Sequence, residues 1–239
     1  MKRALVTGGS GEIGGAICRE LARRGLHVIV HAHENVARAQ ALAQEIRAAA
    51  GSAESVSFDV ADAASAAGYL ERLLEAGSVQ VLVHNAGITS DALMAAMTDE
   101  QWSSVIGVSL NGFFNVTRPL LLPMVRTRWG RIVAISSVAG IMGNRGQANY
   151  AAAKAGLHGA VKSLSLEVAS RGVTVNAVAP GIVASHMAKR AFTDEDIARL
   201  IPMKRAGTPE EIASVVSFLC SEEASYVSGQ VIAVNGAMA

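Results

Sequence analysis

A tyrosine and a lysine stand four residues apart, at Tyr150 and Lys154. On a helix, residues four apart lie on one face, so this spacing brings a phenol and an ammonium group together. A nearby cation stabilises phenolate and lowers a tyrosine pKa from about 10, which suits a general acid or base. Ser137 follows an apolar run and is placed to donate to the same substrate oxygen. The alternative is a partly buried tyrosine beside an unrelated surface lysine.

A glycine-rich turn near the start of the chain indicates a phosphate site. It follows the apolar run 3–7, precedes a helical pattern over 13–24, and contains the residues expected to contact a cofactor: Gly8, Ser10, Gly11, Glu12, Ile13 and Gly14. Such a turn lets the backbone approach a pyrophosphate, which then lies against the positive end of the helix. Its place in the first strand–helix unit makes this common pattern informative, so we expect a dinucleotide here.

The end of the second predicted strand favours NADP(H), without excluding NAD(H). The strand ends in His31-Ala32-His33, with Arg38 nearby. A free ribose 2′-hydroxyl favours a carboxylate at this point, whereas a 2′-phosphate is repelled by one. Ala32 occupies the acidic position, while His31, His33 and Arg38 are donors, and we expect His33 to contact the cofactor. The alternative is that both histidines are simply exposed side chains.

Two further strand ends suit the rest of a dinucleotide. Asp59 and Val60 close the third run, where the carboxylate is placed to accept from an adenine amino group. Asn85, Ala86 and Gly87 close the fourth run, where small residues let a nicotinamide ribose approach. Each is an ordinary strand-end turn by itself, and their regular placement strengthens both interpretations.

Short apolar runs alternate with Ala-rich helical patterns along nearly the whole chain. Seven runs are expected to form strands: 3–7, 27–31, 55–59, 79–84, 131–136, 174–179 and 231–234. Most are continuously apolar, as parallel strands covered on both faces are. Alternation with helices such as 13–24 and 35–50 predicts a single α/β domain over 1–239, a doubly wound, seven-stranded parallel sheet flanked by helices. Its ligand would bind at the carboxyl ends of the strands.

Composition excludes several other classes of protein. The chain has 239 residues, 51% hydrophobic and 17% charged, with a net charge of +1. It is therefore too apolar to be a disordered chain, and it has no overall electrostatic field that would attract it to nucleic acid or anionic membranes. No apolar run approaches the ~20 residues of a membrane span, and the apolar start is interrupted at Thr7, which predicts a cytoplasmic protein. Cys18 and Cys220 are expected to be small buried residues rather than a disulfide.

Two rival chemistries lack the residues that they need. His31 and His33 have no further Cys or Asp cluster to complete a metal site, so no metal is expected. A serine hydrolase needs a Gly-x-Ser-x-Gly turn, and the nearest match, at 8–12, ends in Glu12. Neither a metalloenzyme nor a serine hydrolase is predicted.

Together these residues resemble the short-chain dehydrogenase/reductase family, from Lys2 to about Met238. The matching positions are Thr7-Gly8 with Gly14, Asp59, Asn85-Ala86-Gly87, Ser137, Tyr150 with Lys154, and Pro180-Gly181. Within the family, segments 143–154, 202–205 and 226–231 are similar to the 3-oxoacyl-[acyl-carrier-protein] reductases. The resemblance implies a Rossmann fold and hydride transfer from a nicotinamide.

The resemblance also implies a role for each residue at the reacting end. Tyr150 would protonate the substrate oxygen as hydride arrives. Lys154 would hold the nicotinamide ribose and lower the pKa of Tyr150, and Ser137 would orient the carbonyl. Pro180 and Gly181 would contact the cofactor where the last cofactor-binding strand ends.

A lid and a carrier-protein surface are implied in the same way. The lid would cover about 181–203, with Ile182, which also contacts the cofactor, and with Ser185, His186 and Met187. Its apolar side chains, Met187, Phe192 and Ile201, would accept acyl tails of many shapes. Arg128 and Arg171 match basic side chains beside the active-site mouth that contact an acidic carrier protein in these reductases.

Some positions depart from the family pattern. Glu12 stands where the family has a glycine, and Gly11 stands where NADP-dependent members often have a basic residue. The Glu12 carboxylate suits the helix dipole, but it disfavours a nearby pyrophosphate unless the side chain points outward. Ser109 replaces an Asn that acts largely through its main-chain carbonyl, so we expect Ser109 to serve with reduced or altered activity. Asn111 lies about 200° further round a helix and cannot replace it. His84 stands where the family has Asn, and we expect this change to tune the packing at the end of the strand.

The leading expectation is NADPH-dependent reduction of a 3-oxoacyl thioester, carried by acyl carrier protein, to the 3-hydroxyacyl thioester. The setting would be fatty acid synthesis or related acyl-chain or polyene biosynthesis, and the family default is a homo-tetramer. A second interpretation changes the substrate to a free alcohol, sugar or steroid carbonyl. A third, motivated by Glu12 and Ser109, is a non-catalytic dinucleotide-sensing subunit.

Overall fold

All seven strands lie in one parallel sheet with the order β3-β2-β1-β4-β5-β6-β7. In this computed structural model, which describes residues 1–185 and 192–239, the strands are β1 (Arg3–Thr7), β2 (His27–Ala32), β3 (Ser52–Ser57), β4 (Val81–His84), β5 (Gly130–Ile135), β6 (Val173–Pro180) and β7 (Val231–Val234). The predicted doubly wound sheet is confirmed. Its strand order changes direction between β1 and β4, where such sheets hold their ligand.

The third strand begins three residues earlier than the apolar pattern predicts, at Ser52 instead of Ser55. It pairs with β2 in parallel from His27 opposite Ser52 to Ala32 opposite Ser57. Because β3 is the edge strand of the sheet, only Ala53 of its six residues is buried, so the polar start of the strand carried no apolar signal. Asp59 consequently lies beyond the strand, in the following turn, where Oδ1 accepts the Ala61 N–H at 2.8 Å.

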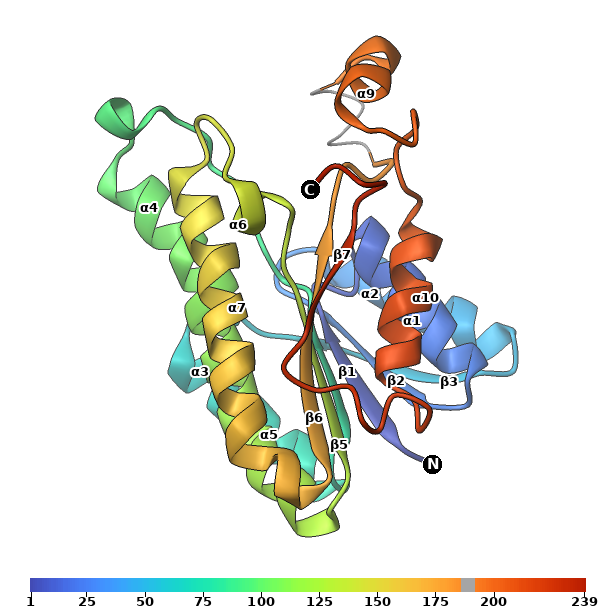
Figure 1. The fold of residues 1–239 in the computed structure, drawn as a ribbon. Helices are drawn as coiled ribbons and strands as arrows, with labels where there is room; N and C mark the ends of the chain where they lie inside the picture. Colours follow the sequence, from blue (N-terminus) through green and yellow to red (C-terminus); the bar gives the residue numbers. More distant parts are fainter. Residues whose placement is uncertain (186–191) are drawn as a thin grey trace.

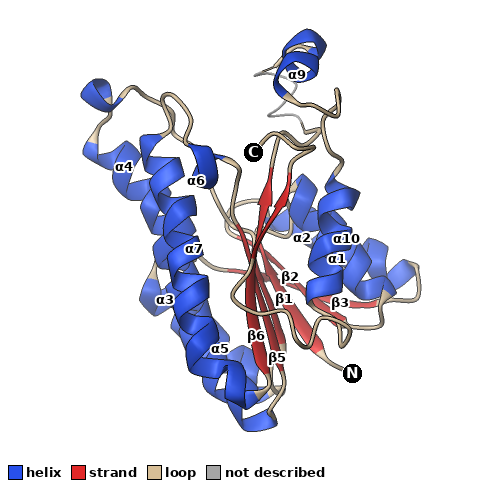
Figure 2. Ribbon diagram, viewed as in Figure 1, coloured by secondary structure: helices blue, strands red, loops and turns tan. Residues whose placement is uncertain are grey.

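Helices cover both faces of the sheet. One layer holds α1 (Glu12–Arg23), α2 (Val36–Ala48) and α10 (Pro209–Leu219), and the other holds α3 (Ala63–Glu75), α5 (Gly112–Thr127) and α7 (Ala148–Val168) (Figures 1 and 2). Alternate residues of β1 divide between the two cores, with Ala4 and Val6 in the first and Leu5 in the second. Cys18 and Cys220 are buried in the first core without a disulfide, as predicted.

A long helical stretch, Asp99–Thr127, runs through α4 (Asp99–Ile106), a π-helical turn (Gly107–Asn111) and α5. Within the described ranges it alone is long and apolar enough to cross a membrane. Its apolar character follows from packing, because Phe113, Leu120 and Met124 belong to the core beneath the sheet. The π turn buries Ser109 and leaves Asn111 exposed, so Asn111 does not replace it.

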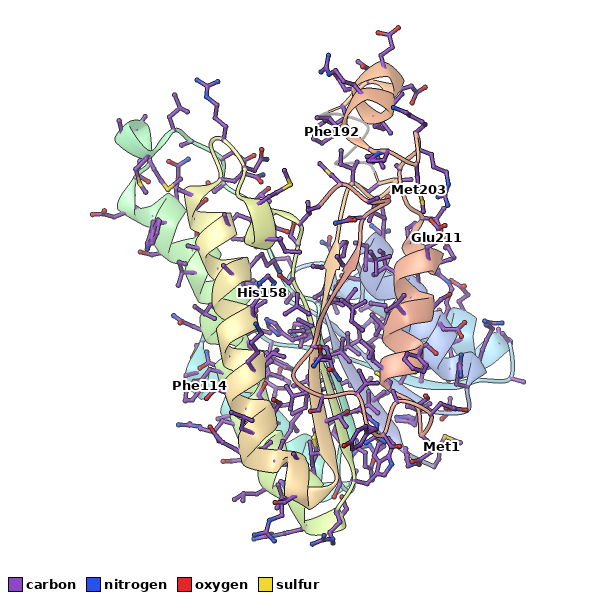
Figure 3. The ribbon with its side chains drawn as sticks, viewed as in Figure 1. Met1, Phe114, His158, Phe192, Met203 and Glu211 are labelled. Atoms are coloured by element: carbon purple, nitrogen blue, oxygen red, sulfur yellow. The ribbon has the colours of Figure 1, made fainter. Side chains whose placement is uncertain are left out.

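The carboxyl end of the sheet is overlaid by α6 (Ala139–Met142) on one side and α9 (Asp194–Leu200) on the other (Figure 1). Phe192 and Met203 flank α9 (Figure 3). The predicted lid residues His186 and Met187 lie outside the described residues. Ile201 is only 1% exposed, and Gly236 of the C-terminal segment packs on it, so the prediction that Ile201 faces an acyl tail is wrong.

Candidate active site

The glycine-rich turn between β1 and α1 is shaped by close backbone approaches. Gly8 has a φ of +62°, and its carbonyl accepts the Gly11 N–H at 3.0 Å. A β carbon at Gly14 would lie 2.3 Å from the Gly8 carbonyl oxygen, so only glycine fits there. Gly11 precedes α1 without a side-chain cap, which leaves the N–H groups of the first turn for a ligand.

Side chains from the neighbouring strands hold this turn in place. Asn85 Nδ2 donates to the Thr7 and Gly8 carbonyls at 3.1 and 3.0 Å. His31 Nδ1 accepts the Gly8 N–H at 3.2 Å, so the ring proton is on Nε2, which donates to the Phe58 carbonyl at 2.9 Å. Burial lowers the pKa of His31 to about 4. Both nitrogens are therefore occupied in a neutral ring, and the prediction that His31 is a donor for a 2′-phosphate is wrong.

A cavity of about 340 Å³ adjoins the turn, between α1, α2 and the start of α10. Ser10, Gly11 and Glu12 line it, together with the basic side chains of Arg19 and Arg38. Arg19 is paired with Glu45 at 2.7 and 2.9 Å. Arg38 makes no hydrogen bond or ion pair with any residue in 1–185 or 192–239, so it is the cation available to a ligand phosphate. His33 is exposed nearby, at the end of β2.

The other predicted cofactor contacts lie along the same edge of the sheet. Val60 is buried, and its carbonyl accepts from Asn115 Nδ2 at 2.9 Å. The Ala86 backbone N–H donates to Thr7 Oγ1 at 3.0 Å. Gly181 leaves β6 so close to Asn235 that a β carbon would lie 2.8 Å from the Asn235 β carbon. The edge is therefore closely packed, with small residues wherever backbones meet.

The structure brings Ser137, Tyr150 and Lys154 together at the carboxyl end of β5. The Ser137 hydroxyl is close enough to the Tyr150 phenol to lower the pKa of the phenol. Lys154 follows one helical turn later, and its Nζ lies 5.5 Å from the centroid of the Tyr150 ring. Nζ donates to the Ile135 carbonyl at 2.8 Å. The phenol, hydroxyl and ammonium group thus form one cluster, as the spacing predicts.

Asn149 is a positioning residue that the sequence analysis missed. It is fully buried, and its Nδ2 donates to the carbonyls of Ser90 and Gln101, both at 2.9 Å. Its Oδ1 accepts the Tyr150 N–H at 2.8 Å, so it joins the start of α7 to two other segments. Its position beside Tyr150 was the only signal in the sequence.

The electrostatics of the cluster differ in one respect from the expectation. Burial raises the pKa of Tyr150, the repulsion of Asp91 adds to this, and the neighbouring Ser137 hydroxyl only partly opposes it. Lys154 is not among the groups that shift the pKa of this phenol, contrary to the predicted lowering. Burial also lowers the pKa of Lys154 to about 8. At neutral pH the site therefore holds a protonated phenol beside a charged ammonium group.

Ser109 completes the cluster from the π turn. It is fully buried, and its Oγ has no hydrogen-bond partner among the described residues. A β carbon on Gly87 would lie 3.1 Å from Lys154 Nζ and 3.4 Å from Ser109 Oγ, so both polar atoms overlie this glycine. The structure thus places Ser109 and Lys154 around the same glycine, without a hydrogen bond between their side chains.

Arg128 and Arg171 lie together at the other end of the sheet. Arg128 follows α5 in a left-handed conformation, with φ of 53°, just before β5, and its guanidinium donates to the Ser170 carbonyl at 3.4 Å. Arg171 stands just before β6. Both turns are opposite to α6 and α9 (Figure 1), about 20 Å of β5 away from Ser137. Within one chain they are not beside the active-site mouth, contrary to the prediction.

The glycine-rich turn after β1 and the buried phenol–ammonium pair beyond the end of β5 together define a dinucleotide-dependent oxidoreductase. The chain belongs to the short-chain dehydrogenase family, whose family model matches residues 2–196. It is 47% identical over 242 residues to the 3-oxoacyl-[acyl-carrier-protein] reductase FabG of Escherichia coli (strain K12), covering 99% of this chain and 97% of the relative. Relatives with the same name from Aggregatibacter actinomycetemcomitans (45% over 236 residues, 98% of each chain) and Staphylococcus aureus (43% over 241 residues, 99% and 98%) are also similar.

Replacing Lys154 by Met should remove a pH-dependent contribution to stability. In the wild type the folded pKa of about 8 lies below the ordinary 10.5, so the unfolded chain binds more protons between these values and stability rises with pH there. Chemical unfolding should be measured from pH 8 to 10.5. Over this range the free energy of unfolding of the wild type should rise by up to about 3 kcal/mol more than that of the variant. A constant difference between the two proteins would contradict the buried charge.

Proposed function

We propose that this protein uses NADPH to reduce the 3-oxo group of an acyl thioester, carried by acyl carrier protein, to a 3-hydroxy group. The setting is fatty acid synthesis or a related acyl-chain or polyene pathway. The observation that carries the proposal is the buried cluster of Ser137, Tyr150 and Lys154 beside the glycine-rich turn. Relatives named as 3-oxoacyl-[acyl-carrier-protein] reductases, 43–47% identical over nearly the whole chain, supply the substrate class.

The residues at the carboxyl edge suit each part of the cofactor. The glycine-rich turn and the start of α1 would bind the pyrophosphate, and Asp59 the adenine. Lys154 and the Asn85–Gly87 turn would hold the nicotinamide ribose, because Gly87 has no side chain to block Lys154 Nζ. When bound, the nicotinamide supplies a hydride.

Ser137 and Tyr150 do the proton chemistry. Their hydroxyls are close neighbours, so a carbonyl oxygen seated against both would accept a hydrogen bond from each. A raised pKa keeps the proton on the Tyr150 phenol at neutral pH, which is the form that carbonyl reduction needs. The Lys154 ammonium then stabilises the phenolate left after the proton is transferred.

Association of several copies is part of the proposal, with a homo-tetramer as the expected assembly. Large apolar side chains lie exposed on the outer side of the α5/α7 layer: Phe114 (57%; Figure 3), Leu122 (62%) and Leu166 (85%). Such side chains on a helix layer support contact with another copy. A neighbouring copy is also needed if Arg128 and Arg171 are to reach a carrier protein seated at the mouth. Their placement in one chain favours the second candidate, reduction of a free carbonyl compound.

Replacing Tyr150 by Phe tests the proposed chemistry. The variant should lose at least about 100-fold in kcat for a 3-oxoacyl thioester, because the proton donor is gone. Its Kd for NADPH should stay nearly unchanged, because the ring remains. Nicotinamide absorbance gives the turnover and fluorescence titration the affinity. Undiminished turnover in the variant would eliminate Tyr150 as the proton donor, and a wild type that binds NADPH without turnover would favour the dinucleotide-sensing subunit.

Replacing Arg38 by Ala tests the cofactor preference. We expect the KM for NADPH to rise about ten-fold or more, since a charge-assisted contact with the 2′-phosphate is lost, while the KM for NADH stays unchanged. Arg47→Ala is the matched control, because Arg47 lies on the same helix and donates to the Ala53 carbonyl instead. Equal effects on both cofactors, or an equal effect of the control, would show that Arg38 does not bind the phosphate.

Reversing the charges of Arg128 and Arg171 distinguishes the two substrate classes. The double variant Arg128→Glu, Arg171→Glu should raise KM for the carrier-bound substrate by about ten-fold or more and leave a small free ketone nearly unaffected. Steady-state kinetics with both substrates gives the comparison. If both substrates respond alike, these arginines do not contact a carrier protein.

A further inference from the structure

His84 is a buried histidine that the proposed chemistry does not use directly. It is the last residue of β4, it is fully buried, and its ring meets the edge of Phe113 with centroids 5.8 Å apart. The sequence analysis expects it only to tune packing. Its hydrogen bonds connect Thr7, at the end of β1, to Ser109 in the π turn.

The neighbours of His84 determine which ring nitrogen carries the proton. Thr7 Oγ1 accepts the backbone N–H groups of Asn85 and Ala86, both at 3.0 Å, which uses both of its lone pairs. The hydrogen of this hydroxyl therefore points to His84 Nδ1, 3.2 Å away. Because Nδ1 accepts, the proton is on Nε2, which donates to the Ser109 carbonyl at 3.0 Å. Burial keeps this imidazole neutral by lowering its pKa to about 3.

The bond to Ser109 holds the π turn at the point where it reaches the active site. Ser109 Oγ and Lys154 Nζ both lie close to Gly87, and Ser109 Oγ has no hydrogen-bond partner in the described part of the chain. An ammonium group has three donors, and Lys154 gives one of them to the Ile135 carbonyl. A shift of the turn would therefore disturb the packing around Gly87, which Lys154 Nζ also approaches.

We propose that His84 is a positioning residue for the reaction: by donating from Nε2 to the Ser109 carbonyl, it holds the π turn in place against Gly87, the glycine that Lys154 Nζ also approaches. Lys154 Nζ and the π turn then keep their places on the two sides of Gly87, next to Tyr150. The kinetic part of this inference rests on the proposed carbonyl reduction. A displacement of about 1 Å in such a site costs up to about 100-fold in rate, so the effect belongs to kcat.

Two substitutions separate the two hydrogen bonds of His84. The amide of His84→Asn ends where Nδ1 stands, so it still reaches Thr7 but not Ser109. The amide of His84→Gln extends further and still donates to the Ser109 carbonyl. His31→Asn is the matched control, because His31 is equally buried and has the same tautomer but contacts Gly8 and Phe58. We expect this control to weaken NADPH binding without loosening the π turn.

The first measurement needs neither substrate nor cofactor. Hydrogen–deuterium exchange of a peptide covering 107–111 should be at least about ten-fold faster in His84→Asn than in the wild type, because an anchor of the turn is lost. It should return to within about three-fold of the wild type in His84→Gln. Exchange that is unchanged in His84→Asn would overturn the proposal.

The second measurement is the kinetic one. His84→Asn should lower kcat about ten-fold or more while the Kd for NADPH stays within about two-fold, and His84→Gln should restore most of kcat. Equal losses in both variants, or losses only in NADPH affinity, would overturn the positioning role. If the wild type itself reduces no 3-oxoacyl thioester, the proposed function fails, while the exchange experiment still decides whether His84 holds Ser109.

Discussion

The buried Lys154 ammonium group is the interaction on which the carboxyl end of the sheet depends. It is only 2% exposed and donates to the Ile135 carbonyl at 2.8 Å. A buried charge is costly unless polar groups surround it; here the Ile135 carbonyl accepts from it, the Tyr150 ring lies 5.5 Å away, and Gly87 leaves space for it. The same charge helps to keep the neighbouring His84 neutral.

Two neutral histidines make this edge rigid. His31 and His84 flank β1, and each accepts a hydrogen from its end, at Gly8 and Thr7. Each also donates from Nε2 to a backbone carbonyl beyond the sheet. Buried imidazoles that are fully hydrogen-bonded define one arrangement of the surrounding loops. The cofactor turn and the π turn are thus linked through side chains rather than through the sheet ladder alone.

Local patterns predicted the sheet, the glycine-rich turn and the Ser137–Tyr150–Lys154 cluster, because strand ends and helical spacing place these residues. Contacts between distant segments were not predictable in this way. Nothing near His84 in sequence indicates its bond to Ser109, and nothing near Asn149 indicates its two carbonyl partners. The edge strand β3 was misplaced because it is partly polar. The position of Arg128 was mispredicted for a similar reason, because matching a residue to a family position does not tell at which end of the sheet that residue lies.

The central claim is that hydride and proton are delivered to the 3-oxo group of a carrier-bound acyl chain. The most direct test supplies the protein with a 3-oxoacyl-[acyl-carrier-protein], an equimolar free ketone and NADPH carrying deuterium at the transferable position. Mass spectrometry of the products then locates the label. The account predicts a single deuterium at carbon 3 of a 3-hydroxyacyl chain that is still attached to the carrier. Deuterium found only in the reduced ketone, with the 3-oxoacyl chain recovered unchanged, would contradict it.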